Sequence, residues 1–180
     1  MNNKLKIFLL LVITLLFHCS EIMAQNKRMV KSKSYQLLLN KLLKHNVPEM
    51  NVDSLNKVST NVLLLDAREK DEYNVSHLNN AKWVGYKTFS LDSLQNIEKN
   101  KPIVVYCSVG YRSEKIVEKL IAAGFTDVQN LYGGIFEWKN EKFDLYNRDG
   151  ITDDVHPYNA TWGLWLKKGR KVYHSPTVIQ

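Results

Sequence analysis

Two short runs of apolar residues constrain the fold most strongly. Residues 62–65 read Val-Leu-Leu-Leu and residues 103–106 read Ile-Val-Val-Tyr, and polar residues follow both runs closely. A strand buried on both faces of a parallel sheet carries such a continuous apolar run, whereas a strand with one wet face alternates. Helical patterns follow the runs, at residues 70–75 and 114–123. Strands that alternate with helices predict an α/β domain with a central parallel sheet flanked by helices.

Further segments extend this pattern toward both ends of the chain. Leucines at helical spacing within residues 35–43 predict an amphipathic helix, and Pro48 marks its stop. The other predicted elements are strands at residues 81–84 and 128–131, a weak helix near residues 91–97, and a short helix at residues 135–138 after a Gly133-Gly134 turn.

The chain is long enough for one domain with a real core and short for two. We place that domain at residues 47–143, after an N-terminal helical segment at residues 25–46 and before a C-terminal extension at residues 144–180. Within the extension, residues 162–173 predict a small β-hairpin or an extended flap. Its aromatic side chains are expected to cover an edge of the domain, and a partner or substrate surface is the alternative.

The first 24 residues predict a signal peptide. Lys4 and Lys6 precede an apolar core at residues 7–17. A membrane-spanning helix needs about 20 apolar residues, so this core fits the apolar region of a signal peptide instead. Cleavage after Ala24 would leave Gln25 as the new N-terminus, and we expect an exported protein of the bacterial periplasm.

A lipoprotein signal, with Cys19 lipid-modified, is the alternative interpretation of this leader. The bulky His18 before that cysteine disfavours it, because lipoprotein signals usually carry a small residue there. If Cys19 leaves with the signal, Cys107 is the remaining cysteine of the mature chain, and no internal disulfide can form.

The charge balance favours no particular macromolecular partner. Lys and Arg number 25 against 18 Asp and Glu, a net charge of +7, but the basic clusters carry no recognisable nucleic-acid motif. We therefore expect solvated surface, no nucleic-acid partner and no stable membrane insertion, and the oligomeric state stays open. His45, His77, His156 and His174 are scattered without ligand spacing, so neither a metal nor another cofactor is expected.

Cys107 stands where the second apolar run ends and a helix begins. A thiol at this place faces free backbone N–H groups and the positive end of a helix dipole, which both stabilise a thiolate. Gly110 lets the following loop curl, and Arg112 adds a permanent cation. The pattern predicts a nucleophilic cysteine beside a loop that holds a small anion. That loop consists of Ser108, Val109, Gly110, Tyr111, Arg112 and Ser113.

Short motifs follow one another in a fixed order across residues 47–143. They are Leu64-Leu65-Asp66-Ala67-Arg68 with Glu72-Tyr73; Ser76-His77-Leu78 with Ala81; Val104-Val105-Tyr106-Cys107 with Gly110, Arg112 and Ser113; Ala123-Gly124-Phe125; and Leu131-Tyr132-Gly133-Gly134-Ile135 with Trp138. Together they resemble the rhodanese family of sulfurtransferases. The resemblance implies a rhodanese-like α/β domain, in agreement with the pattern of strands and helices.

The resemblance also implies a reaction. Cys107 would attack the outer sulfur of a small anionic donor such as thiosulfate, carry that sulfur as a persulfide, and pass it to cyanide or a thiol. Backbone N–H groups from Ser108 to Ser113 would stabilise the transferred sulfur, and Arg112 would hold the sulfonate oxygens of the donor.

Three other polar residues of the motifs are expected to be structural. Asp66 and Arg68 fit an internal ion pair that ties a strand end to neighbouring loops. His77 fits a hydrogen-bonded core residue better than a catalytic base. The motif departs from the family around residues 76–80, where Gly before the histidine and Pro-Gly before the alanine are missing, and this affects a turn remote from the thiol.

Two rival functions remain for comparison. Tyrosine and dual-specificity phosphatases also use a cysteine and an arginine, but with five residues between them. Here only four separate Cys107 from Arg112, and Ser113 occupies the position of the phosphatase arginine. A non-catalytic binding module on the same fold is the stronger alternative, since this fold also serves as a binding module.

Overall fold

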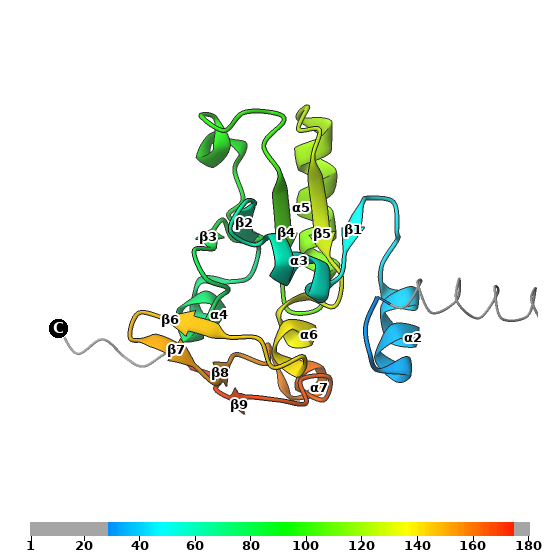
Figure 1. Ribbon diagram of the computed structural model, residues 1–180, viewed down its shortest axis with the longest axis vertical. Coiled ribbons are helices and arrows are strands. Elements are labelled where there is room, and N and C mark those ends of the chain that lie inside the picture. Colours follow the sequence, from blue (N-terminus) through cyan, green and yellow to red (C-terminus); the bar gives the residue numbers. More distant parts are fainter. Residues whose placement is uncertain (1–28, 175–180) are drawn as a thin grey trace, which may run out of the picture.

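A five-stranded parallel sheet forms the centre of the protein. The computed structural model describes residues 29–174, and the expected signal peptide lies outside the described residues. The strands are β1 (Glu49–Met50), β2 (Leu63–Asp66), β3 (Lys82–Trp83), β4 (Ile103–Tyr106) and β5 (Val128–Leu131). Their order is β1-β5-β4-β2-β3, with every neighbouring pair parallel (Figure 1). The predicted α/β fold around a central parallel sheet is confirmed.

Helices cover both faces of this sheet. The helices of this part of the chain are α2 (Lys33–Leu42), α3 (Val52–Val58), α4 (Lys70–Val75), the 3-10 helix η1 (Leu91–Leu94), α5 (Tyr111–Ala122) and α6 (Gly134–Asn140). The helix expected near residues 91–97 is thus a single 3-10 turn. In Figure 1, α3 lies in front of the sheet and α5 behind it.

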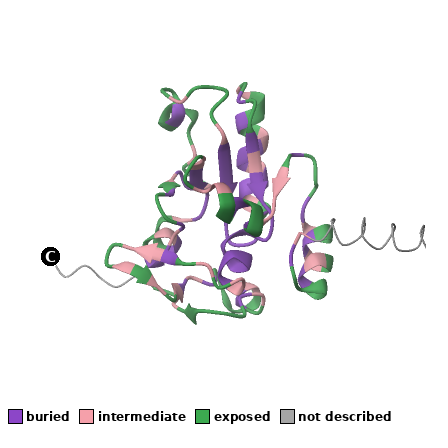
Figure 2. Ribbon diagram, viewed as in Figure 1, coloured by how far each residue is buried: buried purple, intermediate pink, exposed green. Residues whose placement is uncertain are grey.

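Successive strand residues enter two separate hydrophobic clusters, which explains the continuous apolar runs. Leu64 and Val104 pack in the cluster that contains apolar residues of α2, α3 and α6. Leu65 and Val105 belong to the cluster formed with α5. Side chains along a strand alternate between faces, so a strand covered on both sides needs apolar residues at every position. Figure 2 shows the resulting purple, buried centre of the sheet.

The C-terminal extension differs from its prediction. A hairpin exists, but β6 (Leu145–Asn147) and β7 (Gly150–Thr152) form it. The predicted hairpin segment, residues 162–173, instead contains the end of α7 (Ala160–Gly163) and β9 (Arg170–Lys171), which pairs in parallel with β8 (Asp154–Val155).

Local hydrogen bonds explain this placement. At the hairpin turn, the side chain of Asn147 accepts a bond from Asp149 N at 2.9 Å, and Gly150 takes a φ of +118°. At α7, the side chain of Asn159 accepts a bond from Trp162 N at 2.9 Å and caps the helix. The turn before β7 and the cap of α7 therefore fix where these elements begin. The aromatic pattern of residues 162–173 does not predict them.

The two flanks of the domain contact each other across α6. The Tyr35 ring of α2 stacks on Trp165 of the extension, with ring centroids 5.4 Å apart and an interplanar angle of 16°. The Tyr35 hydroxyl donates to the carbonyl of Gly133 at 2.9 Å, just before α6. At the end of α6, the Asn140 amide donates to the carbonyl of Trp165 at 3.0 Å. The helical segment and the extension therefore share the core of the domain.

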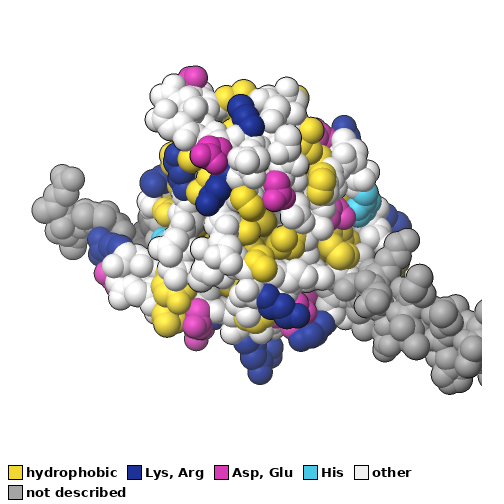
Figure 3. Space-filling view, turned by 45° about the horizontal axis from the view of Figure 1, so that its top comes forward, with side chains coloured by type: hydrophobic (Ala, Val, Ile, Leu, Met, Phe, Trp, Pro, Cys, Tyr) yellow, Lys and Arg dark blue, Asp and Glu magenta, His cyan; other side chains and the backbone are white. Residues whose placement is uncertain are grey.

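The described surface carries mixed charges. Figure 3 shows basic and acidic side chains interspersed on one face, with hydrophobic side chains between them. Across residues 29–174, no helix has both the length and the apolar character to span a membrane. Within the same range, no group of three or more His, Cys, Asp or Glu side chains is arranged to hold a metal ion.

The packing of α2 yields a prediction about stability. Leu39 is fully buried, whereas Leu37 on the same helix is 63% exposed. We expect Leu39→Ala to lower the free energy of unfolding by about 2–5 kcal/mol, because it leaves a cavity in the core. Leu37→Ala, the control, should change it by less than about 0.5 kcal/mol. Urea denaturation followed by circular dichroism measures both. A loss of unfolding free energy for Leu39→Ala as small as that for Leu37→Ala would contradict the packing of α2 into the core.

Candidate active site

Cys107 lies at the carboxyl end of β4, the central strand of the sheet. Its side chain is almost fully buried, at 1% exposure, and lines a cavity of about 360 Å³. The backbone N–H of Gly110 donates to Cys107 Sγ at an N···S distance of 3.2 Å. A donor in this position stabilises negative charge on the sulfur. Ligands of open parallel sheets bind beyond the carboxyl ends of the strands, and the cavity lies there.

The helix after Cys107 begins earlier than predicted. α5 starts at Tyr111, with Gly110 as its N-cap at a φ of +110°, so Tyr111 and Arg112 belong to the first helical turn. Ser113 is fully buried, and its hydroxyl donates to the Asn130 amide oxygen at 2.7 Å. It therefore braces the loop from inside the protein. The predicted loop residues that line the cavity are Ser108, Val109, Tyr111 and Arg112.

The start of α6 holds the loop from a second side. Ile135 N donates to the Cys107 carbonyl at 2.9 Å, and Phe136 N donates to the Ser108 carbonyl at 3.1 Å. A Cβ atom at Gly134 would lie only 2.4 Å from the Cys107 carbonyl oxygen, and Gly134 also has a φ of +57°. Only glycine allows this approach. The sequence identified Gly134 as part of a turn, but its contact with the cysteine loop becomes visible only in the folded structure.

Glu72 of α4 connects the loop to the domain. Its carboxylate accepts two bonds from the Arg112 guanidinium, at 2.6 Å and 2.8 Å, and one from the Ser108 hydroxyl at 3.0 Å. Arg112 Nη2 also donates to Ser108 Oγ at 2.9 Å. The charge of Arg112 is therefore neutralised inside the protein. The sequence motif contained Glu72, but no spacing rule linked it to Arg112, 40 positions later.

The ionisation of Glu72 follows from these contacts. Burial on its own would raise the pKa of this carboxyl group. The hydrogen bonds and positive charge of Arg112 outweigh that effect, with help from the charge of Arg68, and lower the pKa of Glu72 from 4.5 to about 2. The carboxylate thus stays ionised at any pH where a cysteine thiolate would act.

Asp66 and Arg68 lie at the carboxyl end of β2, with their side chains fully buried. Arg68 Nη2 donates to the Asp66 carboxylate at 2.6 Å and to the Ser76 carbonyl at 2.6 Å. Burial favours a lower pKa for Arg68, but Asp66 reverses this and raises it above its usual range. The pair ties the end of β2 to the segment after α4. Neither residue lines the cavity around Cys107.

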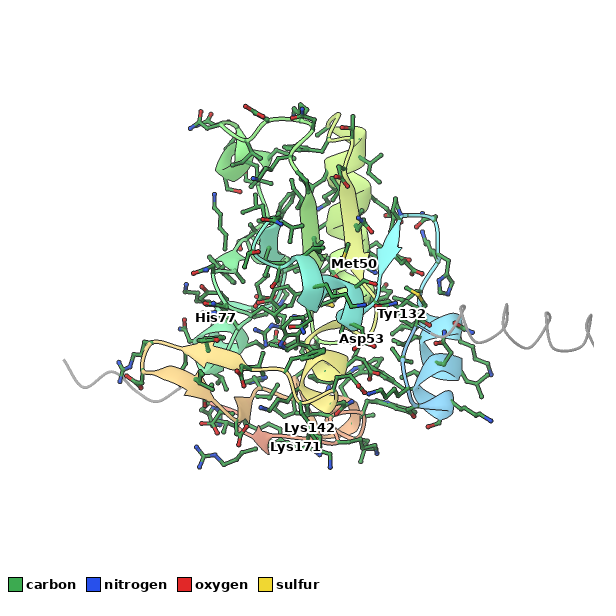
Figure 4. The ribbon with its side chains drawn as sticks, in the orientation of Figure 1. Met50, Asp53, His77, Tyr132, Lys142 and Lys171 are labelled. Atoms are coloured by element: carbon green, nitrogen blue, oxygen red, sulfur yellow. The ribbon has the colours of Figure 1, made fainter. Side chains whose placement is uncertain are left out.

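His77 lies beside the β6–β7 hairpin (Figure 4). Its backbone exchanges hydrogen bonds with Tyr146 of β6, with N···O distances of 2.8 Å and 2.9 Å, and its ring stacks on Tyr73 at 4.2 Å. His77 does not line the cavity. These contacts give it a packing position at the hairpin.

Residues outside the predicted loop complete the cavity wall. They come from α2, from the segments around β3 and α4, and from the extension: Leu42, Glu69, Tyr86, Lys87, Tyr158 and Trp162. The Tyr158 ring lies over the Arg112 guanidinium, with 5.0 Å between the guanidinium carbon and the ring centroid. The sequence placed Trp162 in an aromatic tail, but no local signal distinguishes Tyr86 and Tyr158 from other aromatic residues. Only the tertiary fold brings them to the cysteine.

Comparisons with known proteins agree with this geometry. A family model described as the rhodanese-like domain matches residues 51–141, about half of the chain. The chain belongs to the rhodanese-like family. The thiosulfate sulfurtransferase GlpE of Coxiella burnetii is 32% identical over 78 residues, which are 43% of this chain and 72% of that relative. The predicted membership is confirmed.

Other relatives place the rhodanese-like domain in different contexts. A tRNA uridine(34) hydroxylase of Yersinia pestis is 33% identical over 129 residues, which are 59% of this chain but only 36% of that protein. The solution structure of the rhodanese-like domain of an Anabaena protein has a TM-score of 0.52 and 25% identity, covering 56% of this chain and 79% of that one. The chain is therefore similar to proteins with different named activities.

The Glu72–Arg112 pair predicts a pH dependence of stability. A carboxyl group with a pKa of about 2 when folded and 4.5 when unfolded stabilises the fold above pH 4.5 and loses that contribution as the pH falls toward 2. For wild type relative to Glu72→Gln, we expect the difference in unfolding free energy to shrink by about 2 kcal/mol between pH 6 and pH 3.

Urea denaturation at both pH values measures this difference. Glu118→Gln is the control, because the Glu118 side chain is 30% exposed and its ion pair with Lys115 is screened by solvent. Glu118→Gln should change the pH dependence of the unfolding free energy less than Glu72→Gln does. Identical pH dependence in wild type and Glu72→Gln would contradict the assigned charge state.

Proposed function

We propose that this rhodanese-like protein is a sulfurtransferase that carries sulfur as a persulfide on Cys107. The observation that carries the proposal is the position of this thiol. It lies at the carboxyl end of the central strand, receives the Gly110 N–H at 3.2 Å and opens onto a cavity. A relative named thiosulfate sulfurtransferase supports the same chemistry.

In the first step, the Cys107 thiolate attacks the outer sulfur of thiosulfate or a similar donor. A new S–S bond forms to Cys107, the S–S bond of the donor breaks, and sulfite leaves with the bonding electron pair. In the second step, cyanide or a thiolate attacks the outer sulfur, and Cys107 Sγ leaves as a thiolate. This order of the two steps predicts ping-pong kinetics.

The loop supplies the electrostatics of both steps. Two of its carbonyl groups are engaged by α6, and the Gly110 N–H points at the sulfur. A fixed N–H dipole stabilises charge on sulfur without reorganising during the reaction. In this proposal, Arg112 holds the sulfonate oxygens of the donor while its guanidinium stays paired with Glu72.

The alternative is a non-catalytic module that binds a partner through the same cavity. Similarity to this family does not by itself imply sulfur transfer, since one relative is named for a hydroxylase activity. The presence of the thiol, Gly110 and Arg112 in one loop favours the sulfurtransferase.

Incubation with thiosulfate distinguishes the two functions. We expect the intact mass of the protein to increase by one sulfur atom, with sulfite released in equal amount, and cyanide then to yield thiocyanate. Peptide mapping should place the sulfur on Cys107. Cys107→Ser should lose the mass gain and lower turnover at least about 10³-fold, because the nucleophile is removed. In the unprocessed chain, which retains Cys19, Cys19→Ser is the matched control and should keep both. A wild type without mass gain or turnover would favour the binding module.

We also propose export to the periplasm, on the basis of the apolar core at residues 7–17. In a bacterium that expresses the full chain, we expect osmotic shock to release the protein. Its intact mass should equal that of a chain that begins at Gln25. Leu10→Arg, which interrupts the apolar core, should leave the chain uncleaved inside the cell. A lipid-modified N-terminus at Cys19 would favour the lipoprotein alternative, and an uncleaved wild type would contradict export.

A further inference from the structure

The cavity around Cys107 has walls from outside the matched domain. Leu42 of α2 and both Tyr158 and Trp162 of the extension line it. The family match covers residues 51–141, so all three side chains belong to the flanks. The flanks therefore shape the space that a substrate must enter to reach the thiol.

The extension is fixed against the cysteine loop. Tyr158 adopts a left-handed backbone with a φ of +65°, which costs a residue other than glycine about 1–3 kcal/mol and persists only where the surroundings determine it. Its N–H donates to His156 Nδ1 at 3.0 Å, and the Nε2 atom of that ring lies 2.9 Å from the Tyr173 carbonyl oxygen. The Tyr158 ring in turn covers Arg112. This strained turn presents an aromatic ring to the active site.

Besides the small donor anion, the cavity can hold an organic molecule. Its volume of about 360 Å³ lies in the range of about 300–1,000 Å³ typical of sites for organic ligands. Its wall is mostly apolar and aromatic, with contributions from Leu42, Val109, Tyr111 and Trp162. Three charged side chains also line it: Arg112 is paired with Glu72, and Lys87 and Glu69 carry opposite charges. The wall thus offers more surface to a carbon skeleton than charge to a sulfonate.

We propose that the sulfur acceptor is a small organic thiol with an aromatic or alkyl body, and that Trp162 and Tyr158 determine this specificity. The inference rests on the proposed persulfide of Cys107. The acceptor thiolate attacks the outer sulfur, a new S–S bond forms to the acceptor, and the bond between Cys107 Sγ and that sulfur breaks. Sγ leaves as a thiolate, and the acceptor departs as an organic persulfide.

The burial of Cys107 favours a small acceptor over a cysteine of another protein. The thiol has 1% exposure, and the rings of Tyr158 and Trp162 stand at the cavity wall. A protein cysteine would have to bring its own backbone into the same cavity. A free thiol with a single apolar group needs only the space that the cavity offers.

The test measures the second step of the reaction separately. Protein is first loaded with thiosulfate, and the persulfide is verified by intact mass. The loaded form then reacts with phenylmethanethiol or with 2-mercaptoethanol, two thiols of similar acidity that differ in their apolar body. We expect kcat/KM to be at least about 10-fold higher for phenylmethanethiol, because the phenyl group is removed from water against the cavity wall.

The variants assign this preference to the extension. Trp162→Ala and Tyr158→Ala should each lower the ratio of the two kcat/KM values at least about threefold, measured on protein whose persulfide has been verified by intact mass. Leu164→Ala is the matched control, because Leu164 is 63% exposed in the same extension and does not line the cavity. It should keep the wild-type preference.

The outcomes separate this inference from the proposed function. A wild type that loads sulfur but shows equal kcat/KM for the two thiols overturns the inference and leaves the sulfurtransferase standing. A preference that survives in both variants overturns the role of the extension. A wild type that does not load sulfur overturns the proposed function and, with it, the inference. Since Tyr158 is 48% exposed, its replacement tests the wall even if Trp162→Ala proves unstable.

Discussion

The close contact between α6 and the cysteine loop is the constraint on which the site depends. Both carbonyl groups at the start of the loop, those of Cys107 and Ser108, accept N–H groups of α6. The two backbones come this near because Gly134 has no side chain, and a Cβ atom there would lie 2.4 Å from the Cys107 carbonyl. With its carbonyl groups occupied on that side, the loop presents the Gly110 N–H to the sulfur. The environment of the Cys107 thiol is thus a property of backbone packing.

Glu72 extends this constraint into a network that spans three elements. It lies on α4, accepts bonds from Arg112 on α5 and from Ser108 of the loop, and also accepts the N–H of Glu69 at 3.0 Å. Buried ion pairs stabilise a fold only when their remaining hydrogen bonds are satisfied, and here both carboxylate oxygens are engaged. The network therefore fixes the position of the loop as much as it provides charge near the thiol.

The sequence predicted the parts of the structure that depend on local rules. The run at residues 103–106 coincides with β4, because a strand covered on both faces must be apolar at every position. Cys107 and its loop followed from that strand and the next helix. The helix predicted from residue 114 begins three residues earlier, at Tyr111, because Gly110 caps it. The link between Glu72 and Arg112 could not be predicted, since it depends on how α4 and α5 meet in the folded chain.

The residues proposed for the reaction are close in sequence, whereas the residues proposed for its specificity come together only in the fold. Cys107 and Gly110 stand within one short segment, so the chemistry of the thiol is encoded locally. The wall that faces the thiol is not, because Leu42 and Trp162 reach it from opposite ends of the chain. Separate contacts hold these flanks in place, including the stacked rings of Tyr35 and Trp165 and the β8–β9 pair. A change in the flanks can therefore alter which molecules fit against the wall without disturbing the bonds that hold the loop.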